Sequence, residues 1–231
     1  MSTNSVDVPV AERLNIDMRS EETLLGTSSS VCPSYEHITI FDFDDTLLPS
    51  SWLIQVLQTR GELSDKMKEE MHKLDESAYA LLSTALRLSS VLIITNAEAG
   101  WIRSSCSMFM PLFHSLLKYV TIVSARSRYE EKYPYDCGKW KELTFRDEIE
   151  KLRKEGSFVS LLSIGDSLYE RNAALLYGST NKHSIIKSVK MIELPTPGQL
   201  ITQQRLICNA IPSMIKNREK LDLKLSVEVS I

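Results

Sequence analysis

Two acidic clusters in the sequence could carry metal or phosphate chemistry, and each directly follows an apolar run. The first is DFDDT (residues 42–46), after HITIF, and the second is GDSLYE (residues 165–170), after FVSLLSI. Along an extended chain, Asp42 and Asp44 point to the same side. Carboxylates so close repel unless a cation or a shared proton relieves them, and their oxygens suit Mg²⁺. A magnesium site is therefore one interpretation, and an acidic turn after a strand is the other.

Three further polar side chains could complete such a site. Thr95 and Asn96 follow the apolar run VLIIT, and the Thr95 hydroxyl could donate to a phosphate oxygen or simply cap the next helix. Lys141, near the start of a predicted helix, could bring a positive charge to phosphate and to Asp42. Lys139 is an alternative for this role, and an exposed lysine is the plainer interpretation of either.

The elements that must position these residues follow from hydrophobic periodicity. Short apolar or β-branched runs predict strands over residues 37–43, 91–95, 120–124, 158–164 and 188–194. Helical spacing predicts helices over 51–60, from the N-cap Ser64 through 88, over 140–154 and over 198–211, with a helical region broken near Pro111. Residues 125–139 are expected to form a loop.

Strands that alternate with helices predict parallel βαβ units. The expected fold is an α/β, three-layer, Rossmann-like parallel sheet with helices on both faces. In such sheets the chemistry lies just past the carboxyl ends of the strands. We therefore expect Asp166 to face the same cleft as Asp42, with Thr95 close to both.

The 231 residues fit one α/β domain with short extensions. We expect a poorly ordered N-terminal tail over 1–33, with a short helix from Pro9 to Met18, and a main domain over 34–215. Residues 216–231 form a C-terminal extension in which apolar and polar residues alternate from Leu221 to Ile231, which predicts a half-buried strand at a sheet edge.

Composition argues against several classes of protein. Hydrophobic residues are 43% of the chain, charged residues 25%, and the net charge is −3, so nucleic acid and membrane partners are not expected. Neither a signal peptide nor a long apolar segment is apparent, which predicts a cytoplasmic protein. The four cysteines are scattered, without zinc-ligand spacing and without an Arg six positions later, as a cysteine phosphatase would need.

The order of the motifs resembles the haloacid dehalogenase (HAD) superfamily of phosphatases. That family carries D-x-D-x-T, a Ser or Thr after the second strand, a Lys, and an acidic G-D-x-x-x-[DE]. This sequence has residues 42–46, Thr95, Lys141 and residues 165–170 in those places. The resemblance covers roughly residues 36–200 and implies the HAD-like fold. The short connections after the first and third strands predict a minimal cap domain or none.

The resemblance implies a magnesium-dependent phosphatase. Asp42 would attack phosphorus and form an aspartyl-phosphate, and Asp44 would act as general acid and then base. Mg²⁺ would be held by Asp42, the backbone carbonyl of Asp44 and Asp166, with support from Glu170. The phosphate would be bound by Thr95, Asn96 and Lys141. The acid at position 44 favours hydrolysis over dehalogenase or transport-ATPase chemistry.

An open site would suit a bulky phosphorylated substrate, such as a phosphoprotein, that Arg126 and Arg128 in the 125–139 loop could grip. A small-metabolite phosphatase, a phosphotransferase and a non-catalytic binding protein of the same fold are alternatives. A serine esterase is a further alternative, because residues 165–168 read GDSL. However, the only later Asp, Asp222, has no His three residues on. The oligomeric state is not predicted.

Overall fold

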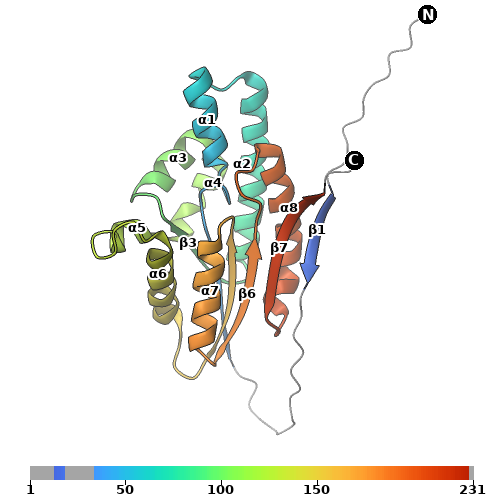
Figure 1. Ribbon diagram of the computed structural model, residues 1–231. Helices are drawn as coiled ribbons and strands as arrows, with labels where there is room; N and C mark the ends of the chain where they lie inside the picture. Colours follow the sequence, from blue (N-terminus) through green and yellow to red (C-terminus); the bar gives the residue numbers. More distant parts are fainter. Residues whose placement is uncertain (1–12, 19–33, 229–231) are drawn as a thin grey trace, which may run out of the picture.

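A seven-stranded sheet forms the centre of the molecule in the computed structural model, which describes residues 13–18 and 34–228 (Figure 1). The strand order is β1-β7-β6-β5-β2-β3-β4. Each neighbouring pair is parallel except β1 and β7, which are antiparallel. The strands are β1 Arg13–Met18, β2 Tyr35–Phe41, β3 Ser90–Thr95, β4 Thr121–Ser124, β5 Phe158–Gly165, β6 Ser184–Lys190 and β7 Leu221–Glu228.

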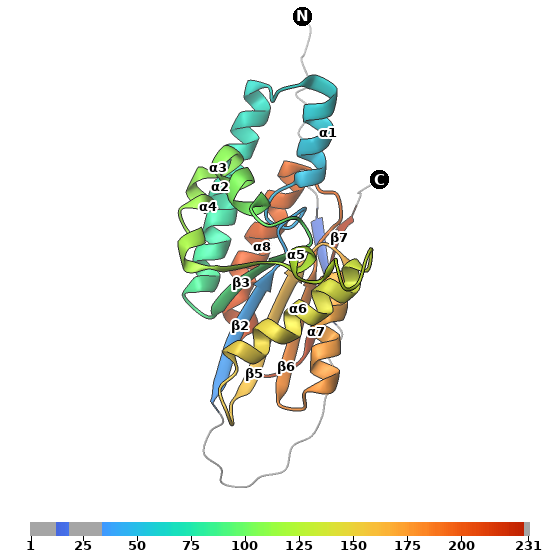
Figure 2. The same cartoon turned by 90° about the vertical axis from the view of Figure 1, so that its left-hand side faces the viewer.

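Helices cover both faces of this sheet (Figure 2). Helices α2, α3, α4 and α8 lie on one face, and α6 and α7 on the other. The helices are α1 Ser50–Arg60, α2 Asp65–Leu86, α3 Trp101–Phe109, α4 Pro111–His114, α5 Ala125–Tyr129, α6 Cys137–Leu152, α7 Leu168–Thr180 and α8 Pro197–Lys216, with a 3₁₀ turn at Leu117–Tyr119. The predicted three-layer α/β fold is confirmed.

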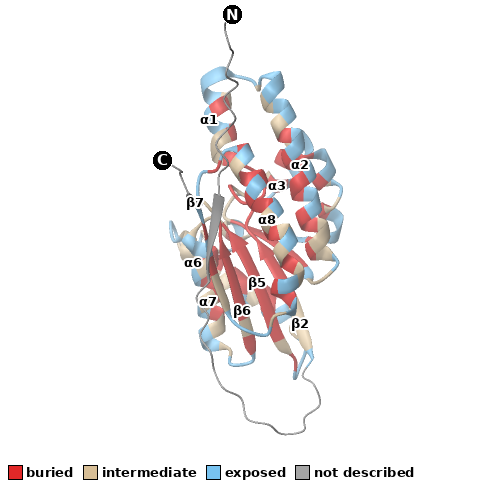
Figure 3. Ribbon diagram, turned by 90° about the vertical axis from the view of Figure 1, so that its right-hand side faces the viewer, coloured by how far each residue is buried: buried red, intermediate tan, exposed pale blue. Residues whose placement is uncertain are grey.

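Strand residues alternate between two hydrophobic cores, as the period of two along a strand requires. On β3, Val91 and Ile93 pack under α2 and α3, whereas Leu92 and Ile94 pack under α6. The central strands β2, β3 and β5 are buried on both faces along most of their length, while the outer helix surfaces are exposed (Figure 3). This explains why the strands read as continuous apolar runs.

The order of the strands creates the position for a site. From β2 the chain proceeds through β3 and β4 toward one edge, then returns to the other side of β2 with β5 and continues through β6 and β7. The order therefore reverses between β2 and β5. In doubly wound sheets the crevice at this reversal, outside the carboxyl ends of the strands, is where ligands bind.

Helix α2 begins where the sequence indicated. The Ser64 side chain accepts from the N–H of Met67 at 3.4 Å, and α1 ends at Gly61 in a left-handed conformation with φ 76°. The buried face of α2 starts only at Met71. The first turns of α2 and helix α1 extend beyond the carboxyl ends of the strands (Figures 1 and 2).

Several predicted elements need correction in their position or type. The first strand ends at Phe41 rather than at residue 43, and the strand expected over 188–194 is β6, Ser184–Lys190. Helix α5 lies in the region 125–139, which we expected to be a loop. Helix α7 begins within the second acidic cluster, at Leu168, and the sequence analysis does not predict it.

The two ends of the chain also differ from expectation. Residues 13–18 form strand β1, where the prediction placed the end of a helix from Pro9 to Met18. The alternating C-terminal segment forms strand β7 but is not the edge of the sheet, because β1 pairs with its outer side. The rest of the predicted tail, residues 1–12 and 19–33, and residues 229–231 lie outside the described residues.

Candidate functional site

Asp42 and Lys141 form the centre of the candidate site. Asp42 follows β2, and its N–H donates to the carbonyl of Ile164 on β5 at 2.9 Å. Lys141, on α6, donates to Asp42 Oδ1 at 2.5 Å, to the carbonyl of Ile94 at 2.5 Å and to Glu170 Oε1 at 2.8 Å. An ammonium group has three protons, so each of its donors has an acceptor. The side chains of Lys141 and Asp42 are only 1% and 9% exposed.

The alternative lysine lies elsewhere. Lys139 Nζ pairs with Glu142 at 3.2 Å, and the Lys139 side chain is 40% exposed. The two lysines are only two positions apart, so they point to different sides of α6. The structure therefore brings Lys141, and not Lys139, to Asp42.

Glu170 is folded back under the end of β5. Its Oε2 accepts from the N–H of Ser167 at 3.2 Å and from its hydroxyl at 2.5 Å, which completes a capping box at the start of α7. A Cβ added at Gly165 would lie 2.6 Å from Glu170 Cγ. Glycine is thus required at the end of β5 so that Glu170 can reach Lys141.

Asp44 lies in the turn after β2 and accepts three hydrogen bonds. Its Oδ1 accepts from the Ser50 hydroxyl at 2.5 Å and from the Trp101 indole N–H at 2.8 Å. Its Oδ2 accepts from the Thr95 hydroxyl at 3.2 Å. Thr95 also accepts from the N–H of Ala97 at 2.9 Å, which is a local turn contact and not a helix cap, because α3 begins after Gly100 without a side-chain cap. The cap interpretation of Thr95 is therefore wrong, and donation to a phosphate oxygen stays a prediction.

The turn itself is fixed by contacts to distant parts of the chain. The Thr46 hydroxyl accepts from the N–H of Asp166 at 3.0 Å, which joins the two acidic clusters. Gln204 on α8 is fully buried and donates to the carbonyls of Thr46 and Leu47 at 3.2 and 3.1 Å. Asp45 has a positive φ of 55° and accepts from the N–H of Ser51 at 3.0 Å.

Around Lys141 there are more negative than positive groups. Burial raises the pKa of Asp42 well above its ordinary value, although Lys141 acts in the opposite direction. Burial alone would lower the pKa of Lys141 and raise that of Glu170, but the ion pairs raise the first and lower the second. One ammonium group is thus shared by two buried carboxylates.

Asp166 is a further, half-buried acid with little compensating charge. Burial, Glu170 and Asp45 raise the pKa of Asp166 to about 7, and Lys190 acts in the opposite direction. Lys190 donates to the backbone carbonyl of Asp166 and pairs with Glu193 at 2.8 Å. The acids after β2 and β5 therefore outnumber the nearby cations. A bound divalent cation would compensate this excess of negative charge.

Mg²⁺ is compatible with the oxygen atoms present, although they do not form a complete protein cage. Across residues 13–18 and 34–228, no three Asp, Glu, His or Cys side chains converge as a ligand set. Mg²⁺ commonly binds one or two carboxylates and keeps several waters. Asp42, Asp166 and the backbone carbonyl of Asp44 suit that mode, whereas both oxygens of Glu170 already accept from protein donors.

The remaining predicted residues lie in different surroundings. Asn96 donates to the carbonyl of Cys137 at 3.3 Å, and its buried Oδ1 has no donor among the described residues. Arg126 pairs at 2.8 Å with Glu130, the residue that directly follows α5. Arg128 pairs at 2.5 Å with Glu148 on α6, so its guanidinium is bound within the protein and is not directed to the acidic cluster.

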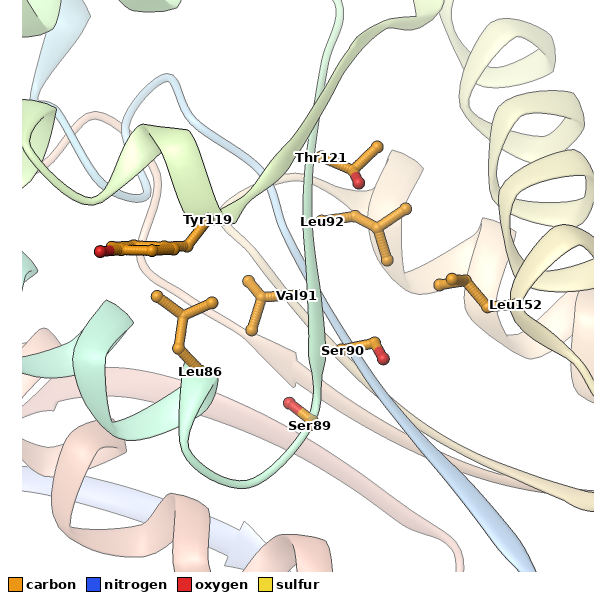
Figure 4. A pocket seen from close by; sticks show the side chains of 8 residues that line it. All are labelled: Leu86, Ser89, Ser90, Val91, Leu92, Tyr119, Thr121 and Leu152. Atoms are coloured by element: carbon orange, nitrogen blue, oxygen red, sulfur yellow. The ribbon is translucent and has the colours of Figure 1, made fainter.

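Two pockets differ in their relation to this site. A pocket of about 190 Å³ is lined by Thr95 and by neighbouring residues of α3 and β4, at the carboxyl end of the sheet. A wider one, of about 510 Å³, lies at the opposite end, where β3 and β4 begin. Its lining consists of Ser89, Ser90, Tyr119 and Thr121 with apolar side chains (Figure 4), and it offers no acid or cation for catalysis.

The structure thus brings together Asp42, Asp44, Thr95, Lys141, Asp166 and Glu170. Ser50 and Trp101 join them without having been predicted from the sequence. No helix among the described residues is long and apolar enough to cross a membrane. A scan against protein-family models and searches of curated proteins and of solved structures find no match to this chain.

Proposed function

We propose that this protein is a magnesium-dependent phosphomonoester hydrolase of the HAD type. The observation that supports this best is the buried cluster of Asp42, Lys141 and Glu170 at the reversal of strand order, with Asp44 and Asp166 beside it. A carboxylate held by a buried lysine outside a parallel sheet is arranged for nucleophilic attack on an anionic group. Burying several charged groups together costs stability, so a cluster of this kind indicates a function that needs it.

In the proposed reaction, a carboxylate oxygen of Asp42 bonds to phosphorus while the bond from phosphorus to the leaving oxygen breaks. Asp44 gives the proton that the leaving oxygen needs. Asp44 then takes a proton from the water that attacks phosphorus, and the bond from phosphorus to Asp42 breaks. Lys141 keeps Asp42 in place, and the Thr95 hydroxyl stabilises a phosphate oxygen.

Asp42, Asp166 and the backbone carbonyl of Asp44 would hold Mg²⁺, which supplies positive charge against the repulsion between carboxylates and phosphate. Glu170 instead orients Lys141, because both of its oxygens are in use. This differs from the supporting role at the metal that the resemblance implies for Glu170.

The proposed substrate class is a bulky phosphorylated molecule, such as a phosphoprotein. Support comes from the connections after β2 and β4, which hold helices α1, α2 and α5 but no separate lid domain within residues 34–228. A small-metabolite phosphatase, a phosphotransferase to another alcohol and a non-catalytic binding protein are the alternatives.

The test is release of phosphate from p-nitrophenyl phosphate with and without chelator. Activity should vanish with chelator and return with Mg²⁺. Asp42→Asn should remove turnover, because the amide keeps the shape and loses the nucleophile. The matched control is Asp65→Asn, the same change on an exposed residue at the start of α2.

Acid-quenched protein should carry phosphate on Asp42 by mass spectrometry. Turnover by a folded Asp42→Asn protein would overturn the proposed mechanism. A wild-type protein that binds phosphorylated ligands without releasing phosphate would indicate the non-catalytic alternative.

A further inference from the structure

Trp101 and Ser50 contact the proposed general acid, Asp44, from two different elements. The Ser50 hydroxyl, on the first residue of α1, and the Trp101 indole N–H, on the first residue of α3, both donate to Asp44 Oδ1, at 2.5 and 2.8 Å. The other oxygen, Oδ2, faces the Thr95 hydroxyl at 3.2 Å. The two oxygens of one carboxylate therefore have different surroundings.

The local structure holds both donors in place. Gly100 has a φ of 95°, a conformation that favours glycine, and it turns the chain so that Trp101 opens α3. Trp101 is partly buried against the main core, and Ser50 is 5% exposed. An indole N–H can only donate, so its contact with Asp44 has a single direction.

We propose that Trp101 and Ser50 are positioning residues that select Oδ2 as the oxygen of Asp44 that transfers the proton. This inference rests on the proposed function. Oδ1 already accepts from two donors, so a proton on Oδ1 would have to displace one of them. Oδ2 lies on the side of Thr95, where the phosphate is proposed to bind.

The proton and the bonds balance in both steps. In the first, the proton leaves Oδ2 for the leaving oxygen as the bond from that oxygen to phosphorus breaks and the bond from Asp42 to phosphorus forms. In the second, Oδ2 accepts a proton from water as the water oxygen bonds to phosphorus and Asp42 is released. When Oδ2 carries its proton, it is a weaker acceptor than a carboxylate oxygen, so the Thr95 hydroxyl can donate to phosphate instead.

The test compares two substrates with different leaving groups in Trp101→Phe, which removes the N–H and keeps an aromatic ring. For glycerol 2-phosphate, whose leaving group needs protonation, kcat/KM should fall roughly tenfold or more, as loss of a hydrogen bond to a charged group implies. For p-nitrophenyl phosphate, whose leaving group needs little protonation, it should change less than about threefold. Ser50→Ala should also lower kcat/KM for glycerol 2-phosphate relative to kcat/KM for p-nitrophenyl phosphate.

Two comparisons separate positioning from a general loss of structure. In an Asp44→Asn background, Trp101→Phe should leave the ratio unchanged, because the residues act as one unit. Trp52→Phe is the matched control, since Trp52 is also partly buried against the main core but on α1, and it should keep the wild-type ratio. Equal losses for both substrates in Trp101→Phe would overturn the inference and leave the proposed function standing.

A second measurement reads the contact without activity. The chain has three tryptophans, so three indole N–H resonances can be assigned by single Trp→Phe changes. Asp44→Ala should shift the Trp101 resonance and speed its exchange with water, while that of Trp140, which donates to the Tyr133 carbonyl at 2.7 Å, should not move. A Trp101 resonance unaffected by Asp44→Ala would overturn the inference. A wild-type protein without phosphatase activity would overturn the proposed function and the inference together.

Discussion

Lys141 has two carboxylates and a backbone carbonyl as its acceptors, and all of them lie at carboxyl ends of strands or at the start of α7. The cluster is complete only when all of these elements are in place. Removing the ammonium group would leave Asp42 and Glu170 buried without compensation, which is far more costly than losing an exposed ion pair.

We predict that Lys141→Met lowers both stability and activity, whereas Lys139→Met changes neither. The free energy of unfolding should fall by about 3–5 kcal/mol in Lys141→Met, because two buried acids lose their shared cation. Turnover of p-nitrophenyl phosphate should fall by at least about 10²-fold. Urea unfolding and phosphate release measure the two effects.

The Lys139→Met control should stay within about 0.5 kcal/mol of wild type, since Lys139 makes an exposed pair with Glu142. A larger effect from Lys139 than from Lys141 would contradict the assignment of the lysine.

The sequence predicts the residues whose type alone limits the chemistry. Few acidic residues directly follow a predicted strand, so Asp42, Asp44 and Asp166 could be selected from the sequence. Lys141 could be selected because few lysines lie at the start of the helix before the strand that precedes Asp166. Trp101 could not be, because an aromatic residue at a helix start is ordinary until Asp44 is seen to accept its N–H.

Residues whose role depends on a distant partner were also misjudged. Arg128 was expected to face substrate, but it pairs with Glu148, twenty positions along the chain. Gln204 was not selected at all, although it fixes the turn that carries the first acidic cluster from 158 positions away. Such contacts follow from packing, which a single sequence does not display.

At the scale of elements, apolar runs predicted the strands on which the site rests. The error at β6 has a clear physical cause. Lys187 and Lys190 both lie in Ser184–Lys190, and Lys187 interrupts its apolar pattern, so the pattern predicts a strand only after Lys187, over residues 188–194. Both lysines are buried, and Lys187 donates to the Ser160 hydroxyl at 2.9 Å and to the carbonyl of Ile215, near the end of α8, at 3.2 Å.

Burial lowers the pKa of Lys187 from 10.5 to about 8, which predicts a pH-dependent stability. Below about pH 8 both folded and unfolded states bind the proton, and the folded state carries the full cost of the buried charge. Between about pH 8 and 10.5 the unfolded state binds more protons, so stability contributed at this site rises with pH by up to about 1.4 kcal/mol per unit. Lys187→Met should lack that rise.

Urea unfolding of wild type and Lys187→Met across this range measures the difference. Relative to wild type, the Met variant should be most stable below about pH 8 and lose its advantage toward pH 10. Lys182→Met, on an exposed lysine before β6, should follow the wild-type profile. Parallel profiles for wild type and Lys187→Met would show that the lysine is not held as the structure indicates.

At the scale of the whole molecule, the strand order gathers the site from segments more than a hundred positions apart. The alternation of strands and helices in the sequence predicted a parallel sheet but not which strands adjoin. The pairing of β2 with both β3 and β5 brings the two acidic clusters together, and the pairing of β1 with β7 closes an edge that the sequence left open. Both pairings are long-range and leave no local signal.

Arg126, on α5, is the side chain that could hold the proposed bulky substrate at this end of the sheet. Arg126 and Arg128 are neighbours on α5 with different partners. Arg126 pairs with Glu130 at 2.8 Å and lies 3.8 Å from Glu98, which lines the pocket beside Thr95. Exposed pairs of this kind contribute little, so Arg126 can exchange its partner for a phosphorylated polypeptide. Arg128 instead pairs with Glu148, whose side chain is 7% exposed.

Arg126→Gln should therefore raise KM for a phosphoprotein about two- to fivefold and leave p-nitrophenyl phosphate unchanged, as expected for the loss of one exposed charge contact. Arg128→Gln, its matched control, should lower the free energy of unfolding by about 1 kcal/mol with the same small effect on both substrates, because Glu148 keeps Lys151 as a partner at 2.7 Å. Steady-state kinetics on the two substrates and urea unfolding provide the readouts. If Arg126→Gln raised KM for the small aryl phosphate as much as for the phosphoprotein, Arg126 would act at the phosphate itself and the expected grip on a bulky substrate would be wrong.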